Sequence, residues 1–115
     1  MAEEKKIRVL MVCAMGMSSS MIEQKTGIAA EKAGVPFVLK AIEMAEISRW
    51  SFAENPMDVV LIAPQIRFKK KSIEQSACPH GSIVLDIDSI AYGMVDGEKI
   101  FEQVMEAIRE RDAGK

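Results

Sequence analysis

The sequence predicts an α/β fold of three layers, in which a four-stranded parallel sheet carries helices on both of its faces. Four short runs of β-branched and apolar residues alternate along the chain with segments that favour helix. Such alternation requires right-handed crossovers between parallel strands. The third run, residues 59–63, is apolar almost throughout, as expected of a central strand that is buried on both faces.

Length and composition set the number of domains. The chain has 115 residues, of which 49% are hydrophobic, enough for one compact domain with one core and too few for two domains of ordinary size. No internal repeat or low-complexity segment interrupts the alternation of strands and helices. We therefore expect residues 1–115 to form a single domain.

The first strand and the first helix lie on either side of a short loop. Residues 7–12 form an apolar run rich in β-formers, which stops abruptly at Cys13. Residues 18–33 favour helix and carry a rough apolar stripe. Gly34 and Pro36 end this helix, because glycine suits the position after a helix and proline cannot continue one.

Three more strand and helix pairs follow by the same criteria of apolar runs, helical periodicity and turn residues. In chain order they are predicted as strand 37–42, helix 46–53, strand 59–63, helix 68–77, strand 82–87 and helix 100–111. The last helix has the clearest amphipathic pattern. Asp96 and Gly97 supply a cap and a turn before it.

Composition excludes several classes of function. Fifteen basic and seventeen acidic residues give a net charge of -2, which offers no general attraction for nucleic acid. The chain has no apolar run long enough to span a membrane and no secretory signal at its start, so we expect a cytoplasmic protein without direct membrane insertion. Cys13, Cys78 and the single His80 do not form a zinc ligand set, and we expect no metal and no cofactor.

Topology indicates where a site would lie. Ligands of open parallel sheets bind outside the carboxyl ends of the strands. The loops after the first, third and fourth strands are therefore the candidate positions for a binding site. These loops cover residues 13–20, 64–67 and 88–96.

The first of these loops has the composition of an anion-binding site. Cys13 stands at a strand end and is followed by Ala14, Met15, Gly16, Met17, Ser18, Ser19 and Ser20, which lead into a helix. Unpaired N–H groups and the dipole at a helix start stabilise phosphate, and the same field lowers the pKa of a nearby thiol. Cys13 is then a candidate nucleophile. The alternative is that Cys13 is a small apolar residue and the serines cap the helix without a ligand.

Residues of the other two loops are weaker candidates. Pro64, Gln65 and Ile66 would lie beside the first loop, where they could form its rim or contact a partner. Tyr92 could join that rim, although packing of its ring against the sheet is favoured. Asp88 and Asp96 suit turns and helix caps, since a carboxylate repels phosphate. Cys78 and His80 precede the fourth strand, at the opposite edge of the sheet, and are expected to be structural.

Three segments resemble one known family. Residues 13–20 (CAMGMSSS) are similar to the phosphocysteine loop of enzyme IIB of the lactose/cellobiose (diacetylchitobiose) type from bacterial sugar phosphotransferase systems. Residues 58–66 (DVVLIAPQI) and 88–97 (DSIAYGMVDG) resemble the segments after that family's third and fourth strands. The resemblance extends over residues 7–108, with Met15, Ser19 and Ala63 as departures from the usual pattern.

The resemblance implies a phosphoryl carrier with a phosphatase-like phosphate loop after the first strand. Such a carrier takes phosphate from a phosphohistidine of a IIA partner on the residue matching Cys13. It then transfers the phosphate to a sugar of the cellobiose, lactose or chitobiose kind, held by a membrane-embedded IIC permease. That activity is a protein-phosphohistidine–sugar phosphotransferase with a phosphocysteine intermediate.

Two other classes of protein share parts of this pattern, but the chain lacks residues that each of them needs. Low-molecular-weight protein-tyrosine phosphatases and arsenate reductases also use a cysteine in such a loop, but they need an arginine six residues after it, where this chain has Ser19. The chain also lacks an Asp-Pro pair to protonate a leaving group. A receiver domain would end its third strand in aspartate, whereas this one ends in Ala63 and Pro64.

Overall fold

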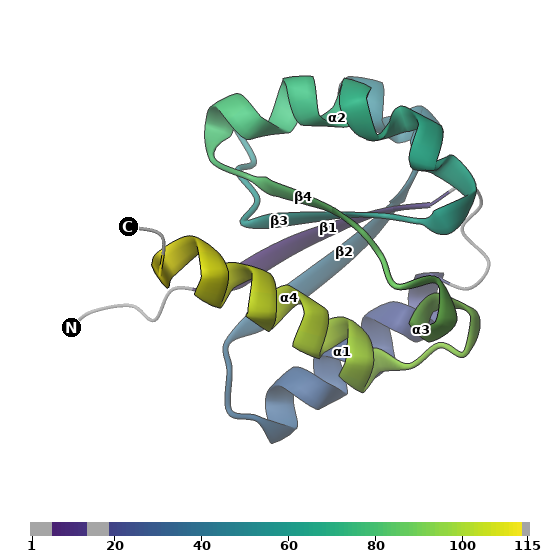
Figure 1. Ribbon diagram of the computed structural model, residues 1–115, viewed down its shortest axis with the longest axis vertical. Coiled ribbons are helices and arrows are strands. Elements are labelled where there is room, and N and C mark those ends of the chain that lie inside the picture. Colours follow the sequence, from purple (N-terminus) through teal and green to yellow (C-terminus); the bar gives the residue numbers. More distant parts are fainter. Residues whose placement is uncertain (1–5, 14–18, 114–115) are drawn as a thin grey trace.

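The computed structural model describes residues 6–13 and 19–113 and confirms the predicted α/β fold (Figure 1). Four parallel strands pair in the order β2-β1-β3-β4, so that β1 and β3 are central. The strands are β1 (Ile7–Cys13), β2 (Phe37–Glu43), β3 (Val59–Ile62) and β4 (Ile83–Asp86). All four lie where the sequence predicts strands.

Helices cover both faces of the sheet (Figure 1). Helix α2 lies on one side, and α1, α3 and α4 lie on the other. The α-helices are α1 (Ser19–Lys32), α2 (Lys70–Ala77), α3 (Ser89–Gly93) and α4 (Gly97–Ala113), and the 3-10 helices are η1 (Met44–Arg49), η2 (Pro64–Lys69) and η3 (Cys78–His80). Helix α4 begins earlier than predicted, and Asp96 caps it as expected, with Oδ1 accepting from Lys99 N at 3.2 Å.

The predicted helix over residues 46–53 is wrong. The chain forms the 3-10 helix η1 instead, and Glu43 and Glu46 cap its start reciprocally. Trp50 is extended, with φ -81° and ψ 128°, which stops the helix after Arg49. The backbone N–H of Asn55 then donates to Ser51 O at 2.8 Å and closes a turn.

The core lies on both faces of the sheet, as the apolar third strand predicts. Alternate residues of a strand point to opposite faces, so Val9 and Met11 of β1 pack in one cluster with α1 and α4 residues. Leu10 and Val12 pack in a second cluster with residues of α2. Every residue of β3 is fully buried.

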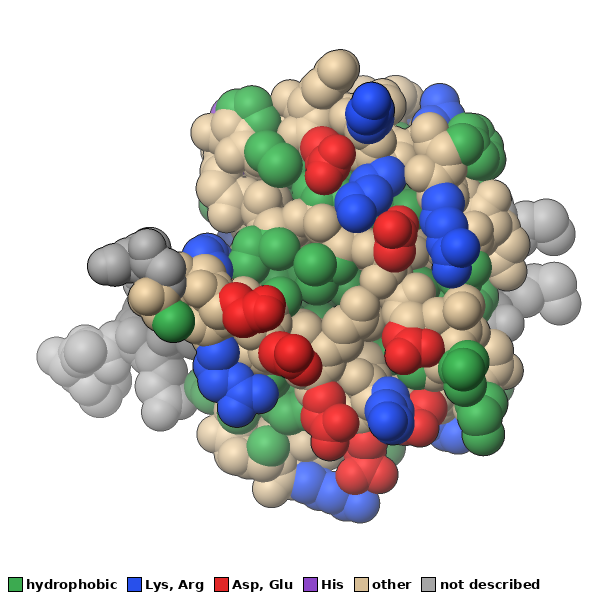
Figure 2. All heavy atoms as spheres, viewed as in Figure 1, with side chains coloured by type: hydrophobic (Ala, Val, Ile, Leu, Met, Phe, Trp, Pro, Cys, Tyr) green, Lys and Arg blue, Asp and Glu red, His purple; other side chains and the backbone are tan. Residues whose placement is uncertain are grey.

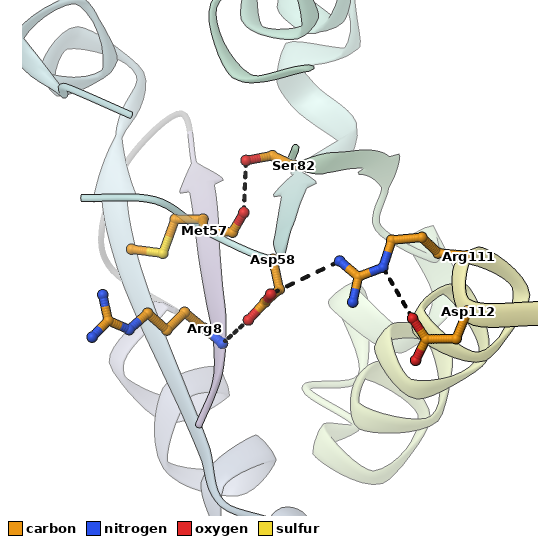
Figure 3. A network of polar contacts seen from close by, with 6 residues as sticks. All are labelled: Arg8, Met57, Asp58, Ser82, Arg111 and Asp112. Atoms are coloured by element: carbon orange, nitrogen blue, oxygen red, sulfur yellow. Dashed lines mark hydrogen bonds and ion pairs between the residues drawn. The ribbon is translucent and has the colours of Figure 1, made fainter. Parts of the chain in front are cut away.

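A polar network joins the elements at the amino edge of the sheet (Figure 3). Asp58, just before β3, accepts a hydrogen bond from the backbone N–H of Arg8 at 2.9 Å. Its other carboxylate oxygen lies 3.8 Å from Nη1 of Arg111, which comes from α4. Close by, Ser82 Oγ donates to the carbonyl oxygen of Met57 at 2.7 Å. These contacts fix the start of β1, β3 and β4 relative to the end of α4, and they lie at the end of the sheet opposite Cys13.

Candidate functional site

The ends of three strands meet at the carboxyl edge of the sheet. Cys13 is the last residue of β1. The backbone N–H of Ala63, just after β3, donates to Val12 O at 3.0 Å, and Ile87 N, just after β4, donates to Ile62 O at 2.9 Å. The carboxyl ends of β1, β3 and β4 therefore lie side by side at this edge.

Part of the predicted phosphate loop lies outside the described residues. This applies to Ala14, Met15, Gly16, Met17 and Ser18, so the cradle that they were expected to form stays a prediction. Ser19 begins α1, and Ser20 is exposed in its first turn. The described residues thus place Cys13 before the loop and the start of α1 after it, which is the strand, loop and helix order that the sequence predicts.

The side chain of Cys13 is fully buried. It belongs to the apolar cluster that includes Met11, Ile22 and Ala91. Burial raises the pKa of the thiol above its ordinary 9.0, because the thiolate loses its solvation. The sequence-based expectation of a lowered thiol pKa is therefore wrong for this structure, since removal from water outweighs the other influences on the group.

Two carboxylates also raise the thiol pKa, and the sequence analysis missed both. Glu43 of β2 is the register partner of Cys13, and Glu23 comes from α1. Their negative charges disfavour the thiolate. Oε2 of Glu23 accepts a hydrogen bond from the backbone N–H of Ala41 at 2.6 Å, which directs this carboxylate towards β2. Only the strand register reveals that Glu43 faces Cys13, and no sequence motif marks either glutamate.

Tyr92 packs against the sheet and against the apolar cluster that contains Cys13. Its ring touches the apolar clusters on the two faces of the sheet, which places it over the strand ends. A hydrogen bond with Tyr92 lowers the pKa of the Cys13 thiol, against the larger effect of burial. Burial raises the pKa of Tyr92 itself, and the charge and the hydrogen bond of Cys13 raise it further.

Helix α3, which carries Tyr92, was not predicted from the sequence. It has five residues, too few for a helical periodicity to be recognised. Asp88 was expected to cap a turn and does so, because its Oδ1 accepts from Ile90 N at 2.9 Å and from Ala91 N at 3.2 Å. Gln103 of α4 holds the preceding backbone, accepting from Asp88 N at 3.0 Å and donating to Asp86 O at 2.8 Å.

The residues after β3 differ in exposure. Pro64 is half-buried and Gln65 is exposed, so both can belong to a rim. Ile66 cannot, since only 2% of it is exposed and it packs in the cluster around Leu10 and Val12. Within η2, Ile66 departs from helical geometry, with φ -123° and ψ 30°. Phe68, two residues later, is by contrast 73% exposed and is the large apolar side chain that this segment presents to solvent.

Large apolar side chains are exposed near the same edge. Ile90 and Met94, at the two ends of α3, are 72% and 71% exposed. Hydrophobic side chains are seen on the surface around α3 in Figure 2. Ile90, Met94 and Phe68 are therefore exposed apolar residues on the segments that follow β3 and β4, near the carboxyl edge. By contrast, Cys78 and His80 are exposed in η3, which leads into β4 at the amino edge as expected.

A pocket of about 340 Å³ lies between α1 and the segment that joins α3 to α4. Lys25, Lys32, Met94 and Glu98 are among its lining residues, and Cys13 and Tyr92 are not. Within residues 6–13 and 19–113, no three His, Cys, Asp or Glu side chains gather as a metal site would require. No helix in that part of the chain is long and apolar enough to cross a membrane.

The family model and the most similar curated proteins point to the same family. Residues 8–103 match the family model described as the lactose/cellobiose-specific IIB subunit of the PTS system. The chain is 33% identical over 105 residues to the oligo-beta-mannoside-specific EIIB component of Bacillus subtilis, covering 85% of this chain and 92% of that protein. It is 30% identical over 94 residues to the galactose-specific EIIB component of Lactococcus lactis, covering 80% and 87%.

Solved structures agree with these matches. The cellobiose-specific IIB component of Borrelia burgdorferi superposes with a TM-score of 0.69 and 33% identity, covering 92% of this chain and 94% of that one. The lactose-specific IIB domain of Streptococcus pneumoniae superposes with a TM-score of 0.73, covering 89% and 97%. At 19% identity, this second likeness shows the fold alone.

Proposed function

The chain belongs to the lactose/cellobiose-specific IIB subunits of the phosphotransferase system, and we propose that it carries a phosphoryl group on Cys13 during sugar uptake. IIB components act as phosphotransferases. The observation that carries the assignment to Cys13 is its place at the end of β1, where the segments after β3 and β4 converge. Cys78, the other thiol of the chain, lies before β4 at the opposite edge.

The proposed reaction has two transfers with the sulfur as the intermediate acceptor. In the first, the thiolate lone pair of Cys13 forms the S–P bond while the N–P bond of a phosphohistidine breaks. The electron pair of that bond stays on the imidazole nitrogen, and the imidazole takes up the proton that the thiol lost. In the second, a sugar hydroxyl oxygen forms the O–P bond, sulfur keeps the S–P electron pair, and the hydroxyl proton returns to the thiolate through solvent. Positioning and charge stabilisation carry most of such a transfer.

Burial of the sulfur has a consequence for this reaction. A fully buried thiol cannot meet a phosphohistidine, so docking of the donor must expose Cys13 before transfer. A buried site also keeps water away from the phosphorylated sulfur, which favours transfer over hydrolysis. Both effects suit a carrier that exchanges phosphate only with its partners.

The proposed partners are a IIA protein, which supplies the phosphohistidine, and a IIC permease, which holds the sugar. The exposed apolar residues Phe68, Ile90 and Met94 support docking at the carboxyl edge, because protein interfaces gather apolar side chains at their centre. Encounters of a carrier with two successive partners are brief and use a modest interface. Gln65, exposed in the same region, belongs to the proposed contact surface.

The proposed substrate is a sugar of the cellobiose, lactose or chitobiose kind. The relatives are named for different sugars, namely oligo-beta-mannoside, galactose and cellobiose, yet this chain matches each of them over most of its length. All three are EIIB components of a phosphotransferase system. This supports phosphoryl transfer as the task of the IIB chain, with the sugar recognised mainly by the IIC partner.

Phosphorylation followed by intact mass tests the proposal. The protein is incubated with phosphoenolpyruvate, enzyme I, HPr and a IIA component, and we expect one phosphoryl group per chain. Cys13→Ser should abolish it, and Cys78→Ser, the matched control, should retain it. Phosphate on another residue, or none on the folded wild-type protein with any IIA of the family, would overturn the assignment. Steady release of inorganic phosphate would instead indicate a phosphatase.

A further inference from the structure

Four of the five residues that follow the buried Ile66 are basic. These are residues 67–71 (RFKKK), which we call the basic segment and which end η2 and begin α2. No acidic residue occurs in the sequence between Asp58 and Glu74. The rest of the chain holds eleven basic and seventeen acidic residues, so a protein with a net charge of -2 carries +4 in the basic segment and -6 elsewhere. Such a separation of charge orients a protein in front of a charged surface.

The basic segment lies at the edge of the sheet where Cys13 ends β1. Helix η2 follows the end of β3, the neighbour of β1. Nζ of Lys70, the first residue of α2, lies 3.4 Å from Oδ2 of Asp86, the last residue of β4, and this is the only salt bridge of the basic segment within the described residues. Lys and Arg side chains gather on the surface around α2 in Figure 2.

Most side chains of the basic segment are open to solvent. Arg67 and Lys71 are exposed, and Lys69 is partly buried. Phe68 is 73% exposed, more than any other large apolar residue in the part of the chain that the structure describes. Three cations without a salt bridge and one aromatic ring are therefore available to a partner.

We propose that the basic segment is a contact surface for the anionic headgroups of a lipid bilayer, with the ring of Phe68 lying among them. Each cation near such a surface strengthens binding about fivefold, and aromatic side chains favour the level of the headgroups. The contact is peripheral and needs no membrane-spanning helix. It goes beyond the proposed phosphoryl transfer, because it requires neither the thiol of Cys13 nor a phosphoryl donor.

The composition of the basic segment favours a lipid surface over an acidic protein. Three of its four cations are lysines, whereas protein interfaces are depleted in lysine and enriched in arginine. Charged residues are also depleted at the centre of protein interfaces, whereas Phe68 stands directly between Arg67 and Lys69. An ammonium group acts as a point charge, which suits headgroups that offer no fixed bidentate geometry.

Contact through the basic segment orients the carboxyl edge of the sheet towards the bilayer. This is the edge of Cys13, so the proposed phosphoryl site faces the membrane in which the proposed permease holds the sugar. Helix α3, with the exposed Ile90 and Met94, lies on the other side of the sheet from α2 (Figure 1). These two residues therefore stay available to protein partners while the basic segment contacts lipid.

The contact is weak and reversible. Three cations at about fivefold each and an aromatic side chain at about tenfold give a partition coefficient of the order of 10³ M⁻¹. About half of the protein is then bound at about 1 mM accessible lipid. Such binding raises the local concentration of the carrier at the membrane without anchoring it there.

Sedimentation with lipid vesicles tests the proposal. The unphosphorylated wild-type protein is mixed at low ionic strength with vesicles of phosphatidylglycerol, which is anionic, or of phosphatidylcholine, which has no net charge. We expect binding to phosphatidylglycerol and at least about tenfold weaker binding to phosphatidylcholine. About 0.5 M NaCl should remove most of the binding, because salt screens exposed charges.

Two variants of the basic segment separate its charge from its aromatic ring. The triple variant Arg67→Gln, Lys69→Gln and Lys71→Gln removes the three cations without a salt bridge and should weaken binding to phosphatidylglycerol roughly 100-fold. Phe68→Ser, an exposed change, should weaken it about tenfold and keep its dependence on salt.

The matched control removes the same charge from another part of the surface. Lys25→Gln, Lys32→Gln and Lys99→Gln change three exposed lysines of α1 and α4, which lie on the other side of the sheet from α2. This second triple variant should bind phosphatidylglycerol within about threefold of wild type, because charges more than a Debye length from the bilayer are screened.

Three results of the vesicle assay would overturn the proposal. These are equal binding of wild type to the two lipids, no binding to about 5 mM phosphatidylglycerol, and equal losses in the two triple variants. If wild type fails to bind vesicles and the triple variant of the basic segment loses phosphate transfer from a IIA component, the segment contacts protein instead. The vesicle assay contains no phosphoryl donor, so failure of Cys13 to accept phosphate would reject the proposed function and leave the lipid contact in place.

Discussion

Gly97, the first residue of α4, lies directly against the backbone of Lys25 in α1. A Cβ atom at this position would be 2.6 Å from the carbonyl oxygen of Lys25 and 2.6 Å from the backbone nitrogen of Thr26. Neither group can move without shifting α1. The two helices that cover one face of the sheet therefore meet at a point where only glycine fits.

Gly97→Ala should destabilise the protein because the added methyl group must push α1 and α4 apart. We expect a loss of about 1–3 kcal/mol in the free energy of unfolding, measured in urea. Gly27→Ala is the matched comparison in α1, since nothing lies within 4 Å of its Cβ position. It should stabilise the protein by up to about 1 kcal/mol through helix propensity. Equal effects of the two changes would show that the close approach at Gly97 does not exist.

Sequence patterns predicted most of the fold because the strands are short, apolar and well separated. The runs at 7–12, 37–42, 59–63 and 82–87 all became strands, and the burial of β3 on both faces followed from its composition. The helix over 46–53 was wrong because turn geometry after Trp50 competes with helical propensity. Helix α3 was missed because five residues are too few to show a helical period.

The sequence predicted where Cys13 lies in the fold but not the direction in which the pKa of its thiol is shifted. Topology alone places Cys13 at the carboxyl edge, and the structure agrees. The direction of its pKa shift was wrong because burial and the register partner Glu43 depend on the packed structure. The burial of Ile66 and the packing of Tyr92 lie in η2 and α3, two short elements in which no helical periodicity can be recognised from the sequence.

Cys13 should react with iodoacetamide far more slowly than Cys78. Cys13 is fully buried with a raised pKa, whereas Cys78 is exposed, so at about pH 8 we expect at least a roughly tenfold difference in rate. Peptide mass after timed alkylation gives the two rates in one wild-type sample. In urea the difference should disappear, which serves as the control. Comparable rates in the folded protein would contradict the observed burial of Cys13.

Alkaline pH should destabilise the protein partly through Cys13. The pKa of the folded thiol lies above the ordinary 9.0, so above about pH 9 the unfolded chain loses a proton that the folded chain keeps. Stability from this group is complete below that pH and is lost as pH rises through the folded pKa. Thermal unfolding from about pH 7 to pH 10 should therefore fall more steeply in wild type than in Cys13→Ala. Cys78→Ala should follow wild type, and parallel curves for all three proteins would contradict the expectation.

Asp88→Ala should destabilise the protein at the start of α3. The side chain of Asp88 accepts from Ile90 N at 2.9 Å and from Ala91 N at 3.2 Å, and its loss leaves both donors without this acceptor. We expect a loss of about 1 kcal/mol in the free energy of unfolding, measured in urea. Asp88→Asn is the matched comparison, because asparagine keeps an acceptor oxygen at the cap and caps helices about as well as aspartate, so its free energy of unfolding should stay close to that of wild type. Equal losses in the two variants would show that the charge of Asp88, and not the cap, stabilises this part of the fold.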